Sequence, residues 1–339
     1  MQRAATISAA FCIGLLLVLF VRGAGGVVRS PQVTYGGLTG ALFGYDVGLD
    51  RSAPLVRGVN KLPVAWSWSP DGSRLAYVLL DFNSGLYEIL LWSPHIRQSS
   101  SVARGLPFGS PPQWSPDGRI IAAVDINQDI CLYTLAGRPP ACLNVQPAGQ
   151  PSWSPDGAAI AYLSRLPEGG LLRVDIADGR VTPLFTGYNG VNHPRWSPQG
   201  SVIAFSFQSG QSGRRHLYLV PSEGGAIRAL TSGDSWQDQP VWSPDGRYLA
   251  YNEHPADSAA QPDVAVIDAE SGQVTQVTTH PLIDTDPRWS PDGRYLSFVS
   301  DRFDGKPRLH VVSTAALDAI EPVAQPGVLM RLYAYAWRP

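Results

Sequence analysis

The chain of 339 residues is long enough for two or three average domains, or for one large closed β architecture. Charged residues make up 16% of it, and 26 basic and 28 acidic residues leave a net charge of −2. A nucleic-acid partner requires a basic stripe that neutralises phosphates, and no run of like charges occurs here. The 34 Gly and 30 Pro, together with ten Trp, thirteen Tyr and ten Phe, predict many short strands joined by turns.

The N-terminal segment predicts a hydrophobic helix. Residues 4–21 carry no charge between Arg3 and Arg22, and a helix of that length reaches about 27 Å, close to the ~30 Å hydrocarbon core of a bilayer. We therefore assign 1–26 as a signal anchor that contacts the membrane through residues 4–21, with residues 27–339 outside the cytoplasm. A signal peptide cleaved near Gly23-Ala24-Gly25 is the alternative, and would give a secreted or periplasmic protein. A buried core helix is a third interpretation.

A repeat predicts the architecture of residues 27–339. The motif Trp-Ser-Pro-Asp-Gly begins at Trp68, Trp114, Trp153, Trp242 and Trp289, a variant with Gln199 in place of Asp begins at Trp196, and the chain ends on Trp337-Arg338-Pro339. The mean spacing of about 45 residues is typical of four-stranded propeller blades. Ser-Pro-Asp-Gly has the residues of a tight turn, in which Gly adopts a positive φ. We expect the repeated Trp to pack between neighbouring blades as a structural residue.

The two ends of the repeat region predict how the ring closes. The last strand, around 333–337, occupies an innermost position and has no later strands to pair with. Three N-terminal strands, near 32–35, 41–45 and 53–56, can complete its blade and remove the open edges. We therefore predict an all-β, seven-bladed propeller closed by N- and C-terminal strands. Six blades is the alternative, if the first strands do not form a blade.

Two cysteines fall on one predicted hairpin. In a hairpin centred on Ala136-Gly137, Cys131 and Cys142 lie directly opposite each other, where Cβ atoms come close enough for a disulfide. A disulfide would indicate an oxidising compartment. The alternative is two independent small hydrophobic residues.

These repeats, with Ser300-Asp301-Arg302 and Ser222-Glu223-Gly224-Gly225 farther along the blades, resemble the WD-like propeller repeats of the TolB family. The resemblance covers about residues 30–339. It implies a β-propeller, and a role like that of TolB implies binding of protein partners of the cell envelope. Similar propellers also form the body of oligogalacturonate lyases, which implies the alternative of a small-ligand enzyme.

The strand order places the short turns on one face and the variable loops on the other, which we call the mouth. Variable loops on a rigid scaffold are common binding sites. Polar residues cluster at the mouth end of the innermost strands of four successive blades. They are Gln150, Asn192, His193, Asp238, Gln239, Asp284 and Asp286. Two interpretations remain open: a pocket for a ligand, peptide or hard cation, or a channel lined by solvated polar groups.

The sequence contains none of the common catalytic motifs. There is no Gly-x-Ser-x-Gly, no His-Glu-x-x-His, no phosphate loop and no Cys-x-x-Cys. One His among amides and carboxylates is a poor transition-metal set, so we expect neither a metal site nor a cofactor. We predict a non-enzymatic scaffold that binds a protein or peptide at the mouth. The alternative is a lyase that uses His193 as base.

Overall fold

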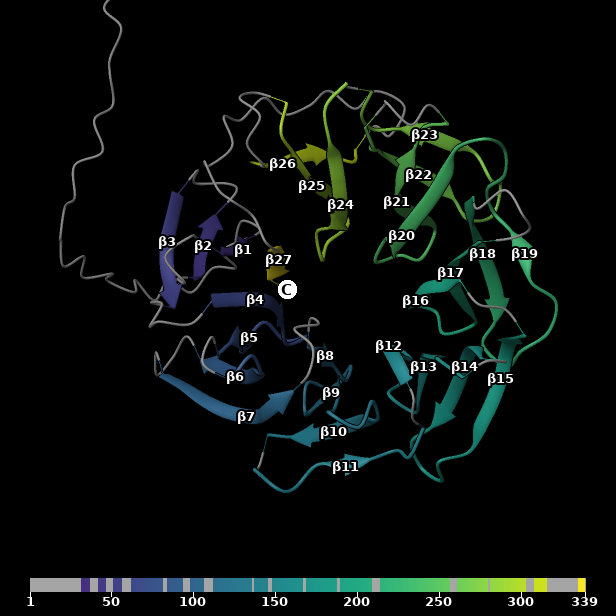
Figure 1. Cartoon of the computed structure of the whole chain (residues 1–339). Helices are drawn as coiled ribbons and strands as arrows, with labels where there is room; N and C mark the ends of the chain where they lie inside the picture. The colour runs from purple at the N-terminus through teal and green to yellow at the C-terminus, as the bar shows by residue number, and fades with distance from the viewer. Residues whose placement is uncertain are drawn as a thin grey trace, which may run out of the picture.

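The computed structural model describes residues 32–338, apart from 37–41, 47–50, 57–61, 82–83, 94–97, 107–111, 136, 146–147, 167–168, 188–189, 209–213, 257–260, 280, 303–307 and 316–334. Every described element is a strand, and the sheets stand around a central axis as the blades of a propeller (Figure 1). The prediction of an all-β propeller is confirmed. The expected N-terminal hydrophobic helix in 1–26 lies outside the described residues. Among those described, none form a helix with the length and apolarity that a membrane span requires.

Six sheets are built from strands that follow one another in the sequence. The first contains β4 (Leu62–Trp68), β5 (Leu75–Leu80), β6 (Tyr87–Ser93) and β7 (Gln98–Leu106). The second contains β8 (Gln113–Trp114), β9 (Ile120–Val124), β10 (Ile130–Thr134) and β11 (Ala141–Cys142). The third contains β12 (Ala148–Trp153), β13 (Ala159–Ser164), β14 (Gly170–Asp175) and β15 (Val181–Thr186).

The other three consecutive sheets follow the same order. The fourth contains β16 (Val191–Trp196), β17 (Val202–Gln208), β18 (Arg215–Pro221) and β19 (Arg228–Ala229). The fifth contains β20 (Trp236–Trp242), β21 (Tyr248–His254), β22 (Asp263–Asp268) and β23 (Val274–Gln276). The sixth contains β24 (Asp284–Trp289), β25 (Tyr295–Ser300) and β26 (Arg308–Ser313).

A seventh sheet joins the two ends of the chain, and we call it the closing sheet. Its strands, in spatial order, are β27 (Tyr335–Arg338), β1 (Gln32–Gly36), β2 (Leu42–Asp46) and β3 (Arg51–Val56). β1 pairs antiparallel with β27, so one C-terminal strand and three N-terminal strands share a sheet, as the sequence predicts. The indole nitrogen of Trp68 donates to Thr34 Oγ1 at 2.8 Å, which joins the closing sheet to the sheet of β4.

The Ser-Pro-Asp-Gly turns are structural, as predicted. In each of the five Asp copies, Ser Oγ donates to Asp Oδ1 at 2.5 or 2.6 Å, and the same oxygen accepts a backbone N–H two residues later. In three of the copies these hydrogen bonds lower the pKa of the carboxyl group, at Asp71, Asp117 and Asp156. The hydrogen bond from Ser69 lowers the pKa of Asp71 to about 2, with further lowering from Ser73.

The glycine of each turn also meets the preceding blade. Gly157 has a φ of 73°, and a Cβ placed on it would lie 3.5 Å from Pro116 of the preceding turn. The same contact joins Gly118 to Pro70 and Gly293 to Pro244. Glycine therefore satisfies two requirements at this position, a left-handed backbone and close packing between adjacent turns.

The motif Trp residues join adjacent blades, with one exception. The indoles of Trp114, Trp153, Trp242 and Trp289 each donate at 3.0–3.2 Å to a backbone carbonyl of the preceding blade. The indole of Trp196 donates instead to Gly200 O of its own turn, at 2.9 Å. This is the copy with Gln199, whose amide reaches the next turn and donates to Asp245 O. The sequence variant thus coincides with a local change of packing.

Candidate functional site

The mouth ends of four innermost strands share one unusual backbone geometry. β12, β16, β20 and β24 each pair irregularly with the next strand, because a two-residue β-bulge interrupts the register. The first residue of each bulge has a positive φ, between 49° and 56°, although none is glycine. These residues are Gln150, His193, Gln239 and Asp286. Four of the seven residues that the sequence predicts at the mouth are therefore left-handed bulge residues.

Each bulge residue is followed by a proline, and this proline is a signal in the sequence from which the bulges could be predicted. The tetrapeptides are Gln150-Pro151-Ser152-Trp153, His193-Pro194-Arg195-Trp196, Gln239-Pro240-Val241-Trp242 and Asp286-Pro287-Arg288-Trp289. Proline lacks the N–H of a ladder hydrogen bond, so inside a sheet it is tolerated at bulges and edges. Left-handed non-glycine residues are strained and persist where the surrounding structure holds them in place.

Amide side chains hold two of these bulges across the boundary between blades. Gln150 Oε1 accepts a hydrogen bond from the backbone N–H of His193 at 2.6 Å. Asn252 Oδ1 accepts one from the backbone N–H of Asp286 at 3.0 Å. Asn252 also donates to Asp238 Oδ1 at 3.1 Å. Asp238, Asn252 and Asp286 are therefore joined by consecutive hydrogen bonds. The structure thus brings Gln150 to His193, and Asp238 through Asn252 to Asp286.

Basic groups neutralise the predicted carboxylates. Asp238 Oδ1 lies 3.4 Å from His254 Nε2, and its Oδ2 lies 3.7 Å from Arg215 Nη1. Burial alone would raise the pKa of Asp238, but the hydrogen bond and charge of His254, with a hydrogen bond from Asn252, hold that pKa below its usual range. The His254 ring is held in turn by stacking on Trp236, with 3.5 Å between ring centroids.

Asp284 and Asp286 are also paired with arginines. Asp284 is fully buried and accepts a hydrogen bond from Arg302 at 2.6 Å. Asp286 accepts one from Arg288 at 3.1 Å. In the described part of the chain, each of Asp238, Asp284 and Asp286 lies beside a cationic side chain, and the interpretation of these carboxylates as a hard-cation site stays a prediction.

His193 is a neutral imidazole under ordinary conditions. Burial lowers its pKa to about 4, and the nearby guanidinium of Arg195 lowers it further than the charge of Asp238 raises it. Its Nδ1 lies 3.5 Å from Ser206 Oγ, which donates at 3.2 Å to the carbonyl of Asn192. Asn192 itself donates to Gly190 O at 3.2 Å. His193 and Asn192 therefore belong to a hydrogen-bonded mouth lining.

Two cavities meet at Gln150. The first, which we call the channel cavity, has a volume of about 240 Å³, and its lining includes Ile89, Val124, Gln113, Gln150, His193 and Arg195. The second, which we call the mouth groove, has a volume of about 270 Å³, and its lining includes Gly149, Gln150, Ser164, Arg165, Gly190 and Asn192. Apolar walls with a few convergent polar groups are typical of ligand pockets. Gln113, Arg195 and Arg165 were not among the residues predicted for this site.

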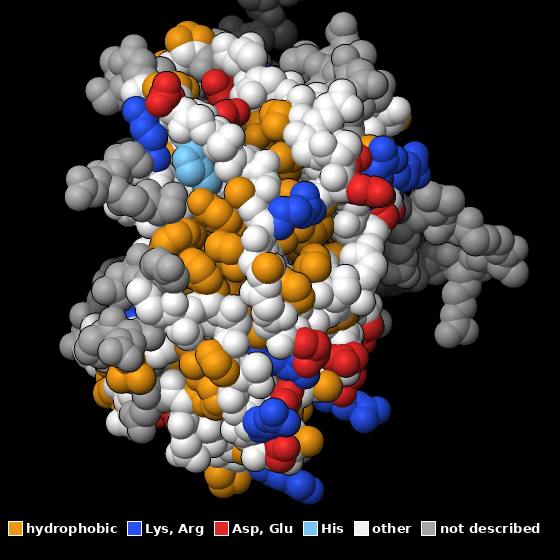
Figure 2. Space-filling model, turned by 90° about the vertical axis from the view of Figure 1, so that its right-hand side faces the viewer, with side chains coloured by type: hydrophobic (Ala, Val, Ile, Leu, Met, Phe, Trp, Pro, Cys, Tyr) orange, Lys and Arg blue, Asp and Glu red, His pale blue; other side chains and the backbone are white. Residues whose placement is uncertain are grey.

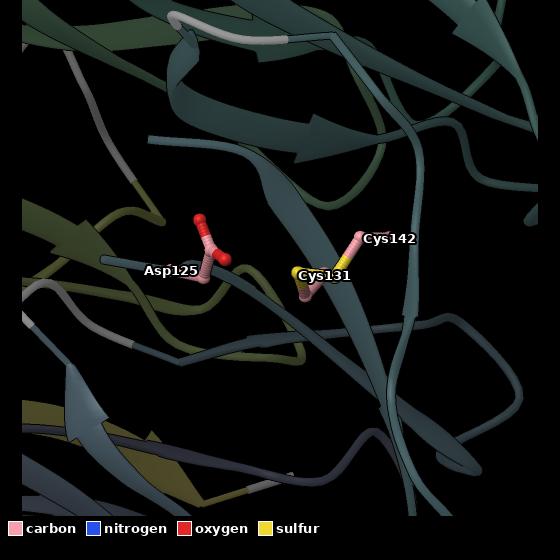
Figure 3. A group of neighbouring side chains, drawn as sticks. All are labelled: Asp125, Cys131 and Cys142. Atoms are coloured by element: carbon pink, nitrogen blue, oxygen red, sulfur yellow. A yellow bond between two sulfur atoms is a disulfide. The ribbon is translucent and has the colours of Figure 1, made fainter. Parts of the chain in front are cut away.

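Cys131 and Cys142 form a disulfide, and they occupy opposed positions on β10 and β11 in the predicted register. Asp125 lies beside them, and Figure 3 shows the carboxylate near the two sulfurs. Among the described residues these three form the one group of His, Cys, Asp or Glu side chains with the spacing of a metal site. Both sulfurs are committed to the disulfide, so they do not act as thiolate ligands here.

Hydrophobic side chains also gather away from the mouth. In Figure 2, which looks onto the right-hand side of Figure 1, they occupy the middle of the view and charged side chains surround them. The sheets of β15, β18 and β19 lie on that side of the ring (Figure 1). Among the side chains of the third and fourth sheets, Phe185, Tyr218 and Ile227 are partly buried against the core that these sheets share.

Comparison with known proteins agrees with the repeat and the fold. Residues 142–255 match the TolB beta propeller domain. The predicted resemblance to TolB-type repeats is thus confirmed over these residues. No match was found among the curated proteins.

Solved structures share the propeller fold at low identity. TolB from Acinetobacter baumannii is 18% identical with a TM-score of 0.57, over 92% of this chain and 67% of that one. An oligogalacturonate lyase in complex with manganese is 18% identical with a TM-score of 0.65, over 87% of this chain and 85% of that one. The periplasmic gluconolactonase PpgL from Pseudomonas aeruginosa is 16% identical with a TM-score of 0.60, over 91% and 99%. TolB-type repeats therefore occur here on a scaffold that enzymes and non-enzymes share.

Proposed function

We propose that this chain is a non-enzymatic, exported propeller that binds a protein or peptide segment at its mouth. The observation that carries the proposal is the left-handed bulge repeated at Gln150, His193, Gln239 and Asp286. Such backbone strain costs of order 1–3 kcal/mol per residue, and it clusters at binding sites. The backbone bulge is the same in four blades, while its side chain is Gln, His, Gln or Asp. This is expected where the backbone is structural and the side chains bind a particular ligand.

The dimensions of the mouth favour an extended segment as the ligand. The channel cavity and the mouth groove each have the volume of a few side chains, and both are lined by Gln150. A peptide that follows the two cavities places successive side chains in each. Gly149 packs closely against the Arg165 side chain and Gly190 against Gln208, so the walls of the groove are formed by side chains as well as by backbone.

Export is part of the proposal. A disulfide such as that of Cys131 and Cys142 persists in oxidising compartments. Together with the uncharged segment 4–21, it favours a propeller outside the cytoplasm, held by an N-terminal anchor or released after cleavage. TolB, a structural relative, has the same fold class.

Peptide display on the purified full-length chain tests the proposal. Selected peptides are synthesised and titrated calorimetrically against the wild type, Gln150→Ala and the control Gln199→Ala. Gln199 is an exposed glutamine of the opposite face. We expect Gln150→Ala to weaken binding about tenfold or more, because it removes a group common to both cavities and the support of the His193 bulge. Equal binding by wild type and Gln150→Ala, or no peptide selected at all, would refute the proposed function.

A lyase is the second candidate, favoured by the fold likeness to oligogalacturonate lyases and by the buried, neutral His193. A neutral imidazole at the mouth can accept a proton. The test is incubation with oligogalacturonate and Mn²⁺, with detection of unsaturated products. We expect no product, because the mouth carboxylates are paired with basic side chains. Product formation that is lost in His193→Ala would replace the binding proposal by this one.

A further inference from the structure

Arg195 is a channel cation that lacks a carboxylate of its own. Its side chain lines the channel cavity from β16, and the one side-chain hydrogen bond that it makes in the described structure runs from Nη1 to Pro194 O at 3.1 Å. The other inward arginines of this part of the ring are each bound to a carboxylate. Arg215 faces Asp238 at 3.7 Å, Arg288 faces Asp286 at 3.1 Å, and Arg302 faces Asp284 at 2.6 Å.

The charges near Arg195 leave one positive charge in excess. Asp286 is close enough to act on it, but the oxygens of Asp286 accept hydrogen bonds from Arg288. The neighbouring His193 is neutral, and Asp238 is occupied by Arg215 and His254. Burial, followed by repulsion from Arg288, lowers the pKa of Arg195 to about 10. Arg195 is half-buried, and a charge that is partly removed from water without a partner is costly.

This cation lies at the inner end of an open cavity. Arg195, His193 and Gln150 line the channel cavity together, and Gln150 also lines the mouth groove. A ligand that enters past Gln150 therefore reaches the guanidinium. Gln113 is the remaining polar residue that lines the cavity. Ile89 and Val124 provide low-polarity walls, in which a charge-assisted hydrogen bond is stronger than in water.

We propose that Arg195 is the anchor of an anion site, and that the segment bound at the mouth presents a carboxylate to it. The proposal rests on the proposed function of the mouth and specifies its ligand. A guanidinium offers two parallel N–H donors that match the two oxygens of a carboxylate. The carboxylate supplies the negative charge that the described channel lacks around Arg195. Its source is an acidic side chain or the C-terminus of a peptide, or a sugar acid, and the experiment distinguishes them.

Calorimetric titration of the full-length chain tests the ligand chemistry. The probes are a display-selected peptide in three forms, with all carboxylates free, with an amidated C-terminus and with Asp and Glu replaced by Asn and Gln, and trigalacturonate as the sugar acid. We expect the free peptide to bind best and one of the two neutralised forms to lose about tenfold or more in affinity. If trigalacturonate binds and the peptides do not, the anion site stands and the peptide function fails. Equal affinity for all three peptide forms, without binding of trigalacturonate, refutes the anion site and leaves the peptide function intact.

Variants test Arg195 itself. Arg195→Gln should lose the preference for the carboxylate, Arg195→Lys should retain part of it, and Arg119→Gln should retain all of it. Arg119 is an exposed arginine of the opposite face, 3.9 Å from Asp117. A preference that survives in Arg195→Gln refutes the assignment.

Thermal unfolding without ligand gives a readout that does not depend on any probe. Arg195→Met removes an excess half-buried charge and keeps the aliphatic stem, so we expect an unchanged or higher unfolding temperature at neutral pH. A fall of several degrees, or failure to fold, would show that Arg195 has a structural role in the free protein, and would overturn the proposal.

Discussion

The two ends of the innermost strands obey different rules. At the turn end, the same residues make the same hydrogen bonds in five blades, in which Asp Oδ1 accepts from Ser Oγ and from a backbone N–H two residues later. At the mouth end, the bulge and its positive φ repeat in four blades, but the side chains are Gln, His, Gln and Asp. At the turn end both the residues and the geometry repeat, which indicates a structural role. At the mouth end the backbone geometry repeats but the side chains differ, which is expected of a binding surface.

The largest test of this contrast removes a residue that joins blades at the turn end. We expect Trp289→Ala to lower the free energy of unfolding by about 3–5 kcal/mol, because it opens a cavity and removes the indole hydrogen bond to Val241 O. Urea unfolding measures the loss. Val274→Ala, at a position with 47% exposure, is the control and should cost under about 0.5 kcal/mol. A loss in Trp289→Ala no larger than in this control would contradict the structural role.

Two histidines, His193 at the mouth and His310 in the third strand β26, should titrate in a different pH window from the aspartates of the turn end. His193 and His310 are neutral in the folded state, and burial lowers the pKa of each to about 4. The unfolded chain binds these protons from pH ~6.5 downward, so stability falls between pH ~6.5 and ~4. At the turn end, the hydrogen bond from Ser69 lowers the pKa of Asp71 to about 2, so its contribution is lost below pH ~4.

Urea unfolding as a function of pH separates the two windows. We expect His310→Phe to remove about 2 kcal/mol of the loss between pH 6.5 and 4, since the ring is buried and stacked on Phe298, where Arg302 and Arg308 oppose its protonation. Asp71→Asn should leave that window unchanged and reduce the loss below pH 4. If both substitutions affect the same window, the separation between the two windows is wrong.

The variant turn offers a smaller test within one face. Asp245→Ala removes hydrogen bonds to Ser243 and to the backbone of Arg247, so we expect a loss of about 1–2 kcal/mol. Gln199→Ala removes an exposed amide that reaches the next turn, and should cost less than about 0.5 kcal/mol. Differential scanning calorimetry on both variants checks the order. Equal losses of stability would show that Gln199 stabilises its turn as much as Asp245 stabilises the next turn.

The smallest expected effect is a gain at the mouth. Gln239 has a φ of 53°, a conformation that glycine adopts without strain. We expect Gln239→Gly to raise the free energy of unfolding by about 0.5 kcal/mol, while Gln199→Gly, at a residue without a positive φ, should lower it. Destabilisation in both variants would show that the bulge is not strained.

Most of the fold could be predicted from the sequence, because each feature has a local signal. The turns are predicted by four adjacent residues and the blades by the spacing of Trp. The closing sheet is predicted by strands at the two ends of the chain. The Cys131–Cys142 pairing followed from hairpin register in the same way. The bulges had a local signal as well, in the proline after each bulge residue, such as Pro194 after His193.

The rest of the site depends on partners that no local pattern reveals. Asp284 is bound by Arg302 and Asp238 by Arg215, and these arginines come from other strands or loops. For this reason the sequence shows the mouth carboxylates but not the arginines that pair with them.

The rotated Trp196 indole is a similar case. Its neighbour Arg173 lies 5.8 Å from the ring centroid, at a position where other blades have Leu91, Leu132, Leu219 and Val266 opposite the Ala of the second strand. The packing of that indole therefore depends on a residue of the preceding blade, which the motif itself does not contain.

The pairing of β1 with β27 has a consequence for the order of events during synthesis. Thr34, which accepts the indole hydrogen bond of Trp68, is made close to that partner in the sequence, but β1 receives its second neighbour only when residues 335–338 have been made. Until then one edge of β1 is open, and an open edge can pair with another chain. Contacts between such distant segments form slowly. We therefore expect the newly made chain to be most prone to aggregation in the interval before the ring closes.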